Sequence, residues 1–275
     1  MDIKSIQILN NNIKIPILGM GMYLISGREK VRYTINCALK SGYRHFDTAA
    51  FYANEEDIGR VIGESDITRQ ELFITTKLWN SDHGYESTFR ALNTSLNKLK
   101  LDFVDLYLIH WPVEGSRLES WRAMERLLAD GKTRAIGVSN YMKHHLEELF
   151  DHCQIIPTIN QIELSPFNYL SRADTINFCF ENNISIEAYS PLTKGYKLKD
   201  PDLIKIAIKY RKSTAQLLIR WALEHQFIVI PKSAKMNHIL ENADVFDFSI
   251  SKQDMEYLDG LNEDLVTSWD PTNTR

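Results

Sequence analysis

The chain has 275 residues, of which 44% are hydrophobic and 25% are charged, the proportions of an ordinary globular protein with a large core. Its net charge of -4 and its lack of long Lys/Arg runs exclude the basic face of a nucleic-acid binder. The three cysteines lie far apart, and no apolar run approaches the roughly 20 residues of a membrane span. We therefore expect a cytoplasmic protein with no nucleic-acid partner, no membrane association and no bound metal.

The first 17 residues predict a β-hairpin. Residues 6–9 and 13–17 are β-type runs, and the Asn10, Asn11 and Asn12 turn between them tolerates positive φ angles. No linker or change of composition follows. Residues 1–275 are therefore expected to form one domain, with residues 1–17 as the hairpin and residues 262–275 as a C-terminal tail.

From residue 18 onward, short β-type runs alternate with segments of helical period. Strands are predicted at residues 18–21, 45–47, 72–77, 103–110, 135–139, 158–161, 185–189 and 227–230. Helices are predicted at residues 30–41, 54–64, 85–99, 118–130, 143–153, 173–181, 207–225 and 236–242. This alternation favours a closed (β/α)8 barrel, the TIM barrel, with the N-terminal β-hairpin at the barrel bottom. An open doubly wound sheet is the alternative, but its usual G-x-G-x-x-G fingerprint is missing.

Polar or aromatic side chains follow most of the predicted strands. In a (β/α)8 barrel this carboxyl end of the strands is where active sites lie. The residues concerned are Asp47-Thr48, Lys77-Leu78-Trp79, His110-Trp111-Pro112, Ser139-Asn140, Gln161-Ile162-Glu163, Tyr189-Ser190-Pro191 and Pro231-Lys232-Ser233. Charged groups next to an apolar core are costly unless they are paired. Together these segments predict one site on the rim of the barrel.

These segments resemble, in order, the motifs of the aldo-keto reductases, in particular the small aldehyde and diketogulonate reductase-like members. The resemblance covers nearly the whole chain. It rests on Tyr52 and on GYRHFDTA at 42–49, KLW at 77–79, LYLIHWP at 106–112, IGVSN at 136–140, NQIE at 160–163, AYSPL at 188–192 and IPKS at 230–233. It implies a (β/α)8 barrel that reduces aldehydes and ketones to alcohols with a nicotinamide cofactor.

Four residues are expected to carry the chemistry. The resemblance implies Tyr52 as the proton donor, Lys77 and Asp47 as the pair that tunes it, and His110 as the group that orients the carbonyl. The pKa of a free tyrosine is about 10. A nearby ammonium stabilises the phenolate, so we expect Lys77 to lower the pKa of Tyr52.

The cofactor site is expected on the same rim, within reach of these four side chains. Ser139, Asn140 and Gln161 supply donors and acceptors suited to the carboxamide of a nicotinamide, and Tyr189 can stack on its ring. The resemblance implies further cofactor contacts from Ser190, Leu192, Lys232, Ser233, His238, Glu241 and Asn242.

His238 is a departure from the family pattern. Lys232 and Ser233 resemble the family's contacts to the 2′-phosphate of NADPH, but His238 stands where an arginine is usual. Arginine is always charged and binds phosphate with two hydrogen bonds, whereas histidine is mostly neutral above a pKa of about 6.5. We expect NADPH to be the cofactor and NADH to be accepted as well.

Aromatic residues on the rim are expected to form the substrate pocket. Tyr23, Trp79 and Trp111 follow predicted strands, and Trp269 lies in the C-terminal tail. Such a pocket favours small-molecule carbonyl compounds with an apolar or aromatic body. The resemblance implies a monomer, and no heptad repeat argues for an oligomer.

Two other functions are open at this point. A cofactor-binding regulatory subunit with little turnover would keep the cofactor site, although an intact set of four catalytic residues argues against it. A glycosidase of the same fold would need two carboxylates across the barrel mouth. Asp47 and Glu163 are the candidates at strand ends, and Asp47 is better explained as the partner of Lys77.

Overall fold

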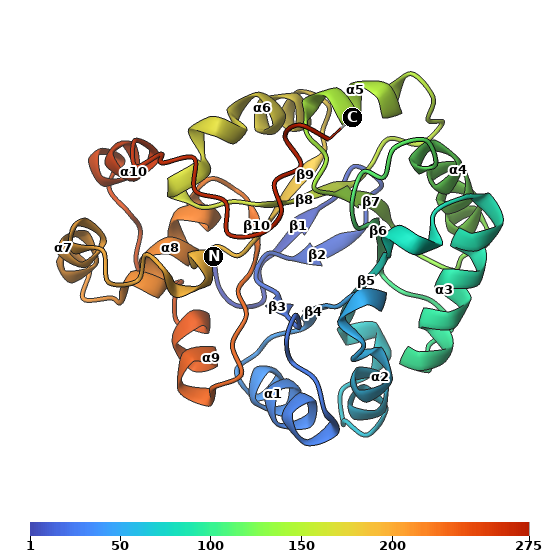
Figure 1. Ribbon diagram of the computed structural model, residues 1–275. Coiled ribbons are helices and arrows are strands. Elements are labelled where there is room, and N and C mark those ends of the chain that lie inside the picture. Colours follow the sequence, from blue (N-terminus) through green and yellow to red (C-terminus); the bar gives the residue numbers. More distant parts are fainter. Residues whose placement is uncertain (275) are drawn as a thin grey trace.

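The computed structural model describes residues 1–274, and eight parallel strands form a barrel at its centre (Figure 1). Around the barrel lie β3 (Met20–Gly21), β4 (His45–Asp47), β5 (Phe73–Leu78), β6 (Leu106–Ile109), β7 (Ile136–Ser139), β8 (Ile159–Glu163), β9 (Ser185–Tyr189) and β10 (Ile228–Ile230). The chain around the first and last strands closes the barrel. The Gly19 N–H donates to the Val229 carbonyl (2.8 Å), and the Val229 N–H donates to that of Ile17 (2.9 Å). The predicted (β/α)8 fold is confirmed.

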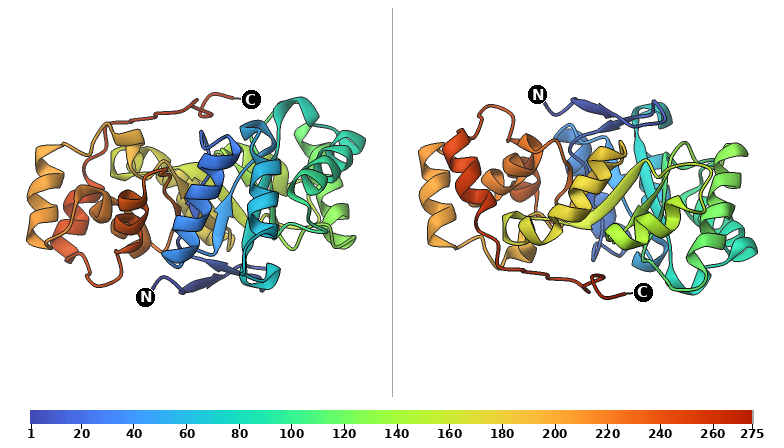
Figure 2. Two further views of the ribbon diagram at one scale, coloured as in Figure 1. Left: turned by 90° about the horizontal axis from the view of Figure 1, so that it is seen from below. Right: turned by 90° about the horizontal axis from the view of Figure 1, so that it is seen from above.

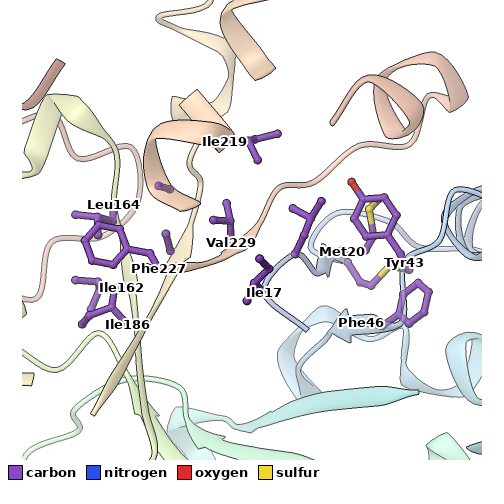
Figure 3. Close-up of a cluster of buried hydrophobic side chains, with 14 of the residues drawn as sticks. Ile17, Met20, Tyr43, Phe46, Ile162, Leu164, Ile186, Ile219, Phe227 and Val229 are labelled. Carbon is purple, nitrogen blue, oxygen red and sulfur yellow. The ribbon is translucent and has the colours of Figure 1, made fainter. Parts of the chain in front are cut away.

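Helices cover the outside of the barrel (Figure 1). They are α1 (Arg28–Lys40), α2 (Glu55–Gly63), α3 (Tyr85–Leu99), α4 (Arg117–Ala129), α5 (Lys143–Phe150), α6 (Ala173–Glu181), α7 (Pro201–Lys209), α8 (Thr214–Glu224), α9 (Met236–Ala243) and α10 (Lys252–Asp259). Their apolar faces pack on the outer faces of the strands. Figure 3 shows part of this layer, with Phe46 and Val229 from strands and Ile219 from α8. Within residues 1–274 no helix is both long and apolar enough to cross a bilayer.

The helix predicted at residues 207–225 is wrong, because two helices occupy this part of the chain. The first, α7, begins at Pro201, where the Asp200 side chain accepts from two backbone N–H groups of the first turn. Arg211 then adopts a φ of 57°, which ends the helical path. The second, α8, begins after Ser213, whose side chain forms a capping box with Gln216. The helix α10 lies in a segment for which no helix is predicted.

The N-terminal hairpin closes the bottom of the barrel. It consists of β1 (Ile6–Ile8) and β2 (Lys14–Pro16), which pair antiparallel, and Asn12 in the turn has a φ of 66°. Directly above it the barrel interior is apolar, with Leu9, Ile15, Phe73, Leu106, Leu108, Ala135, Ile159 and Ile228 in one buried cluster. Figure 2 shows the hairpin and the C-terminal tail at opposite ends of the molecule.

Farther up, the interior changes from apolar to polar. On β5, Phe73 belongs to the lower cluster, so Thr75 and Lys77 face inward by the two-residue period of a strand. His45 enters the same space. Gly19 makes room for it, because a Cβ at Gly19 would come within 2.5 Å of His45 Nδ1. Inward polar groups therefore begin one layer below the rim.

Candidate active site

Lys77 is the centre of the cluster at the top of the barrel. Its Nζ donates to Asp47 Oδ1 (2.6 Å), to the carbonyl of Thr48 (2.9 Å) and to the hydroxyl oxygen of Tyr52 (3.3 Å). The Lys77 side chain is fully buried, and the Asp47 side chain is 3% exposed. An ammonium carries three hydrogens, so each one has an acceptor. The structure thus brings together three of the four residues predicted to carry the chemistry.

The hydroxyl proton of Tyr52 is not used in its hydrogen bond with Lys77 and is available to a ligand in the cavity. Lys77 has no lone pair, so the Tyr52 oxygen accepts from Lys77 while its own proton points elsewhere. Tyr52 lines a cavity of about 840 Å³ at the mouth of the barrel. Burial, followed by the charge of Asp47, raises the pKa of Tyr52 well above its usual value. A lowering of this pKa by Lys77 is not the net result here, because burial has the largest effect on Tyr52 and the charge of Asp47 acts in the same direction.

The loops that follow β3 and β4 place Tyr52. It ends the short 3-10 helix η1 (Ala50–Tyr52), after which Ala53 has a φ of 53°. The buried Asn54 then binds back: its Nδ2 donates to the carbonyls of Met22 (2.9 Å) and Ile25 (2.8 Å). This ties the two loops together and sets the ring of Tyr23 5.0 Å from that of Tyr52.

His110 is the fourth member of the cluster and is held as a neutral ring. It follows β6, and its ring packs edge-on against Tyr52 (5.6 Å) and Trp79 (5.2 Å). Burial, and then the charge of Lys77, lower its pKa well below 6.5. At neutral pH the ring is therefore a hydrogen-bonding group rather than a cation.

The four residues predicted to hold a nicotinamide form one connected wall of the cavity. Ser139 Oγ donates to the Gln161 carbonyl (2.9 Å), and Tyr189 Oη donates to Asn140 Oδ1 (2.8 Å). Asn140 Nδ2 in turn donates to the carbonyl of His110 (3.0 Å), which links this wall to the cluster around Lys77. Asn140 has a φ of 64°, a strained conformation that occurs where a structure positions a functional group.

The cavity extends from this wall past the loop after β9 to α9. Lys232 and His238 line its far end, and Ser190 and Leu192 line its side. Amide and hydroxyl groups at one end and a cationic side chain at the other suit an elongated cofactor with a nicotinamide and a phosphate. Ser233, Glu241 and Asn242 do not line the cavity; Ser233 Oγ is bonded by the backbone N–H of Lys235 (3.1 Å).

The four predicted aromatic residues all line the cavity: Tyr23, Trp79, Trp111 and Trp269. The rings of Trp111 and Trp269 lie 4.6 Å apart. Phe51, which is not among the predicted site residues, stacks on Trp79 at 3.8 Å and also lines the cavity. Its only signal in the sequence is its position next to Tyr52.

Glu163 holds the C-terminal tail across the rim. Its carboxylate accepts from the backbone N–H groups of Thr267 (2.8 Å) and Ser268 (3.0 Å) and from the Thr267 hydroxyl. Arg172 holds the next part of the tail through Asp270 (2.9 Å). Glu163 is thus engaged in binding the tail, which removes the second carboxylate that a glycosidase would need. Arg275, the last residue of the predicted tail, lies outside the described residues.

One further acid of this region, Glu187, escapes prediction from the sequence. It lies in the middle of β9 and is fully buried beside Gln161, which lines the cavity. Its signal is a charged residue within a strand that is otherwise apolar or small, Ser185-Ile186-Glu187-Ala188.

The barrel and the cavity at its mouth define a (β/α)8 protein with a candidate active site at the carboxyl ends of its strands. Comparison with known proteins gives the family. The model described as "Aldo/keto reductase family" matches residues 17–263, and the chain belongs to this family.

Individual relatives agree with this assignment. The chain is 46% identical to a glyoxal reductase of Bacillus subtilis over 93% of this chain and 92% of the relative. The crystal structure of an aldo/keto reductase from Brucella melitensis is 45% identical, covers 94% of this chain and 99% of its own, and superposes with a TM-score of 0.89. A Bombyx mori aldo-keto reductase in complex with NADP is 35% identical over 96% of this chain and 94% of its own, with a TM-score of 0.90.

Proposed function

We propose that the protein is an NADPH-dependent reductase of aldehydes and ketones in which Tyr52 is the proton donor. One observation carries this proposal. All three hydrogens of Lys77 have acceptors, one of them Tyr52, so the proton of the Tyr52 hydroxyl is left for the cavity. The family assignment supports carbonyl reduction, and the NADP complex of the Bombyx mori relative supports the cofactor.

Tyr52, Lys77, Asp47 and His110 each have a separate role in protonating the carbonyl oxygen. When bound, the nicotinamide supplies a hydride to the carbonyl carbon. Tyr52 gives its proton to the developing alkoxide, and Lys77 stabilises the phenolate that remains. Asp47 holds the Lys77 side chain in place. His110, neutral at pH 7, donates an N–H to the carbonyl oxygen and so orients the substrate.

The cofactor is held at two ends. Ser139, Asn140 and Gln161 bind the carboxamide, and Tyr189 covers one face of the ring. At the far end Lys232 binds the 2′-phosphate, while His238 contributes less charge than an arginine would. NADPH is therefore preferred and NADH is accepted. Ser190 and Leu192, which line the cavity, would contact the cofactor between its two ends. Ser233, Glu241 and Asn242 do not line the cavity, so contacts from these three residues to the far end of the cofactor stay a prediction.

The substrates are carbonyl compounds with an apolar or aromatic body. Tyr23, Trp79, Trp111 and Trp269 supply the walls that such a body would contact. The Bacillus subtilis relative is a glyoxal reductase, which brings small dicarbonyls into the same panel. The chain acts as one domain and as a monomer in the cytoplasm.

The test is consumption of NADPH with an aromatic aldehyde and with glyoxal. Tyr52→Phe removes the proton donor and keeps the ring, so turnover falls by about a hundredfold or more, the usual contribution of a general acid. Tyr23→Phe is the matched control, because Tyr23 lines the same cavity 5.0 Å away and loses only a few-fold. Undiminished turnover in Tyr52→Phe refutes the mechanism. A wild-type protein that binds NADPH but reduces no aldehyde favours the regulatory subunit instead.

A further inference from the structure

The barrel interior below the catalytic cluster holds Glu187, an acid to which the mechanism above gives no role. Glu187 on β9 and Gln161 on β8 are direct partners in the register of the two strands, so their side chains are neighbours on the inner face of the barrel. Both are buried. The residue that would hold the cofactor amide therefore rests on a carboxyl group.

Gln161 Nε2 makes two hydrogen bonds to acids. It donates to Glu187 Oε2 (2.5 Å) and to Asp47 Oδ2 (2.8 Å). These use both hydrogens of the amide nitrogen, so the amide oxygen of Gln161 is left to face the cavity, which Gln161 lines. An acceptor in this position is what the NH2 group of a nicotinamide carboxamide requires. A Gln161 held only by Asp47 would be free to turn.

The charges around Glu187 are already balanced, so an ionised Glu187 would add a negative charge without a cationic partner. The groups that face it are His45 and Asp47 from β4 and Lys77 from β5, with Tyr52 farther up; β10 contributes only isoleucine and valine. Burial lowers the pKa of His45 to about 3, so its ring is neutral. Asp47 and Lys77 cancel each other.

The environment of Glu187 fits a neutral acid. Its Oε1 has no hydrogen-bond partner among residues 1–274, and His45 Nε2 lies 3.5 Å from it. A carboxylate would need donors there, whereas a carboxylic acid with its proton on Oε1 needs only an acceptor, which the neutral ring of His45 can supply. Burial, and then the charge of Asp47, raise the pKa of Glu187 to about 8.

We propose that Glu187 is a positioning residue for the cofactor amide: as a neutral acid it accepts the second hydrogen bond of Gln161, and its ionisation at alkaline pH ends productive turnover. An ionised Glu187 would add a buried negative charge beneath Tyr52 and so oppose formation of the phenolate. This inference rests on the proposed function, since it assumes that Gln161 binds a nicotinamide.

Two variants separate the charge of Glu187 from its hydrogen bond. Glu187→Gln keeps an acceptor for Gln161 and cannot ionise. Glu187→Met keeps the length of the side chain and removes the acceptor. NADPH titrated by fluorescence is expected to bind Glu187→Gln within about threefold of wild type and Glu187→Met about tenfold more weakly, as for the loss of one buried hydrogen bond.

Melting of the cofactor-free protein against pH tests the ionisation without catalysis. In the unfolded chain Glu187 has its usual pKa of about 4.5, and in the folded protein the value is raised to about 8. The proton thus favours the folded state fully below pH 4.5, and this advantage is lost as pH rises toward 8. Between pH 5 and pH 9, the Tm of wild type should fall by roughly 5–10 °C more than that of Glu187→Gln.

The pH profile of kcat/KM completes the test. Wild type is expected to lose activity above about pH 8, and Glu187→Gln to move this limb upward by about one pH unit or more. Parallel Tm curves, or an unmoved limb, overturn the ionisation; equal NADPH affinity in Glu187→Met and Glu187→Gln overturns the positioning role. Failure of the proposed function looks different, because wild type itself then binds no NADPH or reduces no aldehyde.

Discussion

The buried pair of Asp47 and Lys77 allows stability and catalysis to be separated by experiment. Asp47→Asn removes the carboxylate and leaves the ammonium of Lys77, which is fully buried, without its ion-pair partner. Breaking one side of such a pair costs about 3–5 kcal/mol. For a chain of this size about 2–4 °C of Tm correspond to each kcal/mol, so Tm should fall by about 10 °C.

Lys77→Met should cost a similar amount, because it leaves Asp47 buried without a cation. The double variant Asp47→Asn/Lys77→Met has no buried charge at this position, and the amide oxygen of the introduced asparagine can still accept from Gln161. Replacing both members of a buried pair is often nearly neutral, so the double variant should recover to within about 2 kcal/mol of wild type. The remaining loss of stability comes from the missing hydrogen bonds of Lys77 to Thr48 and Tyr52.

Thermal melts of the cofactor-free variants measure this coupling, and NADPH consumption with an aromatic aldehyde measures its consequence for turnover. All three variants should lose turnover, since each one removes a partner on which Tyr52 depends. Stability should return in the double variant while turnover does not. If the losses of the two single variants simply add, Asp47 and Lys77 do not interact as the structure shows and the reasoning fails.

Two predictions concern the end of the cavity at Lys232 and His238 and the C-terminal tail. His238→Arg should raise the ratio of kcat/KM for NADPH over NADH by about tenfold, because an arginine binds a phosphate with two charge-assisted hydrogen bonds. Asn237→Arg is the control, since Asn237 does not line the cavity. An unchanged ratio in His238→Arg contradicts the role proposed for His238. Glu163→Ala should free the tail and raise KM for aromatic aldehydes several-fold with little change in kcat, since it removes bonds worth about 1.5–3 kcal/mol each. Unchanged KM and tryptophan fluorescence would show that the tail does not depend on Glu163.

The order of strands and helices was accessible from the sequence because the local signals agree with the tertiary structure. The predicted helices at residues 85–99 and 173–181 coincide with α3 and α6. The failure at residues 207–225 has a local cause. Both helices there carry apolar faces, and the break depends on a positive φ at Arg211, a residue that gives no sign of it. The Asp200-Pro201 start and the Ser213 capping box were the available signals.

For the site, the sequence revealed the residues at strand ends but not the layer beneath them. Asp47, Lys77 and Gln161 stand out because each one closes an apolar run. Glu187 does not, since it lies inside a strand, and its relation to Gln161 depends on the register between β8 and β9. The raised pKa of Tyr52 was equally inaccessible, because it depends on burial and on the nearby charge of Asp47.

The hairpin and the tail lie at opposite ends of the barrel, so the point of attachment to a surface decides which end of the barrel faces the solution (Figure 2). Met1 precedes the hairpin that closes the bottom, whereas Trp269 of the tail lies at the mouth. A protein attached to a solid support through Met1 would present its mouth to the solution. Attachment through the tail would turn the mouth toward the support and load the segment that Glu163 holds in place.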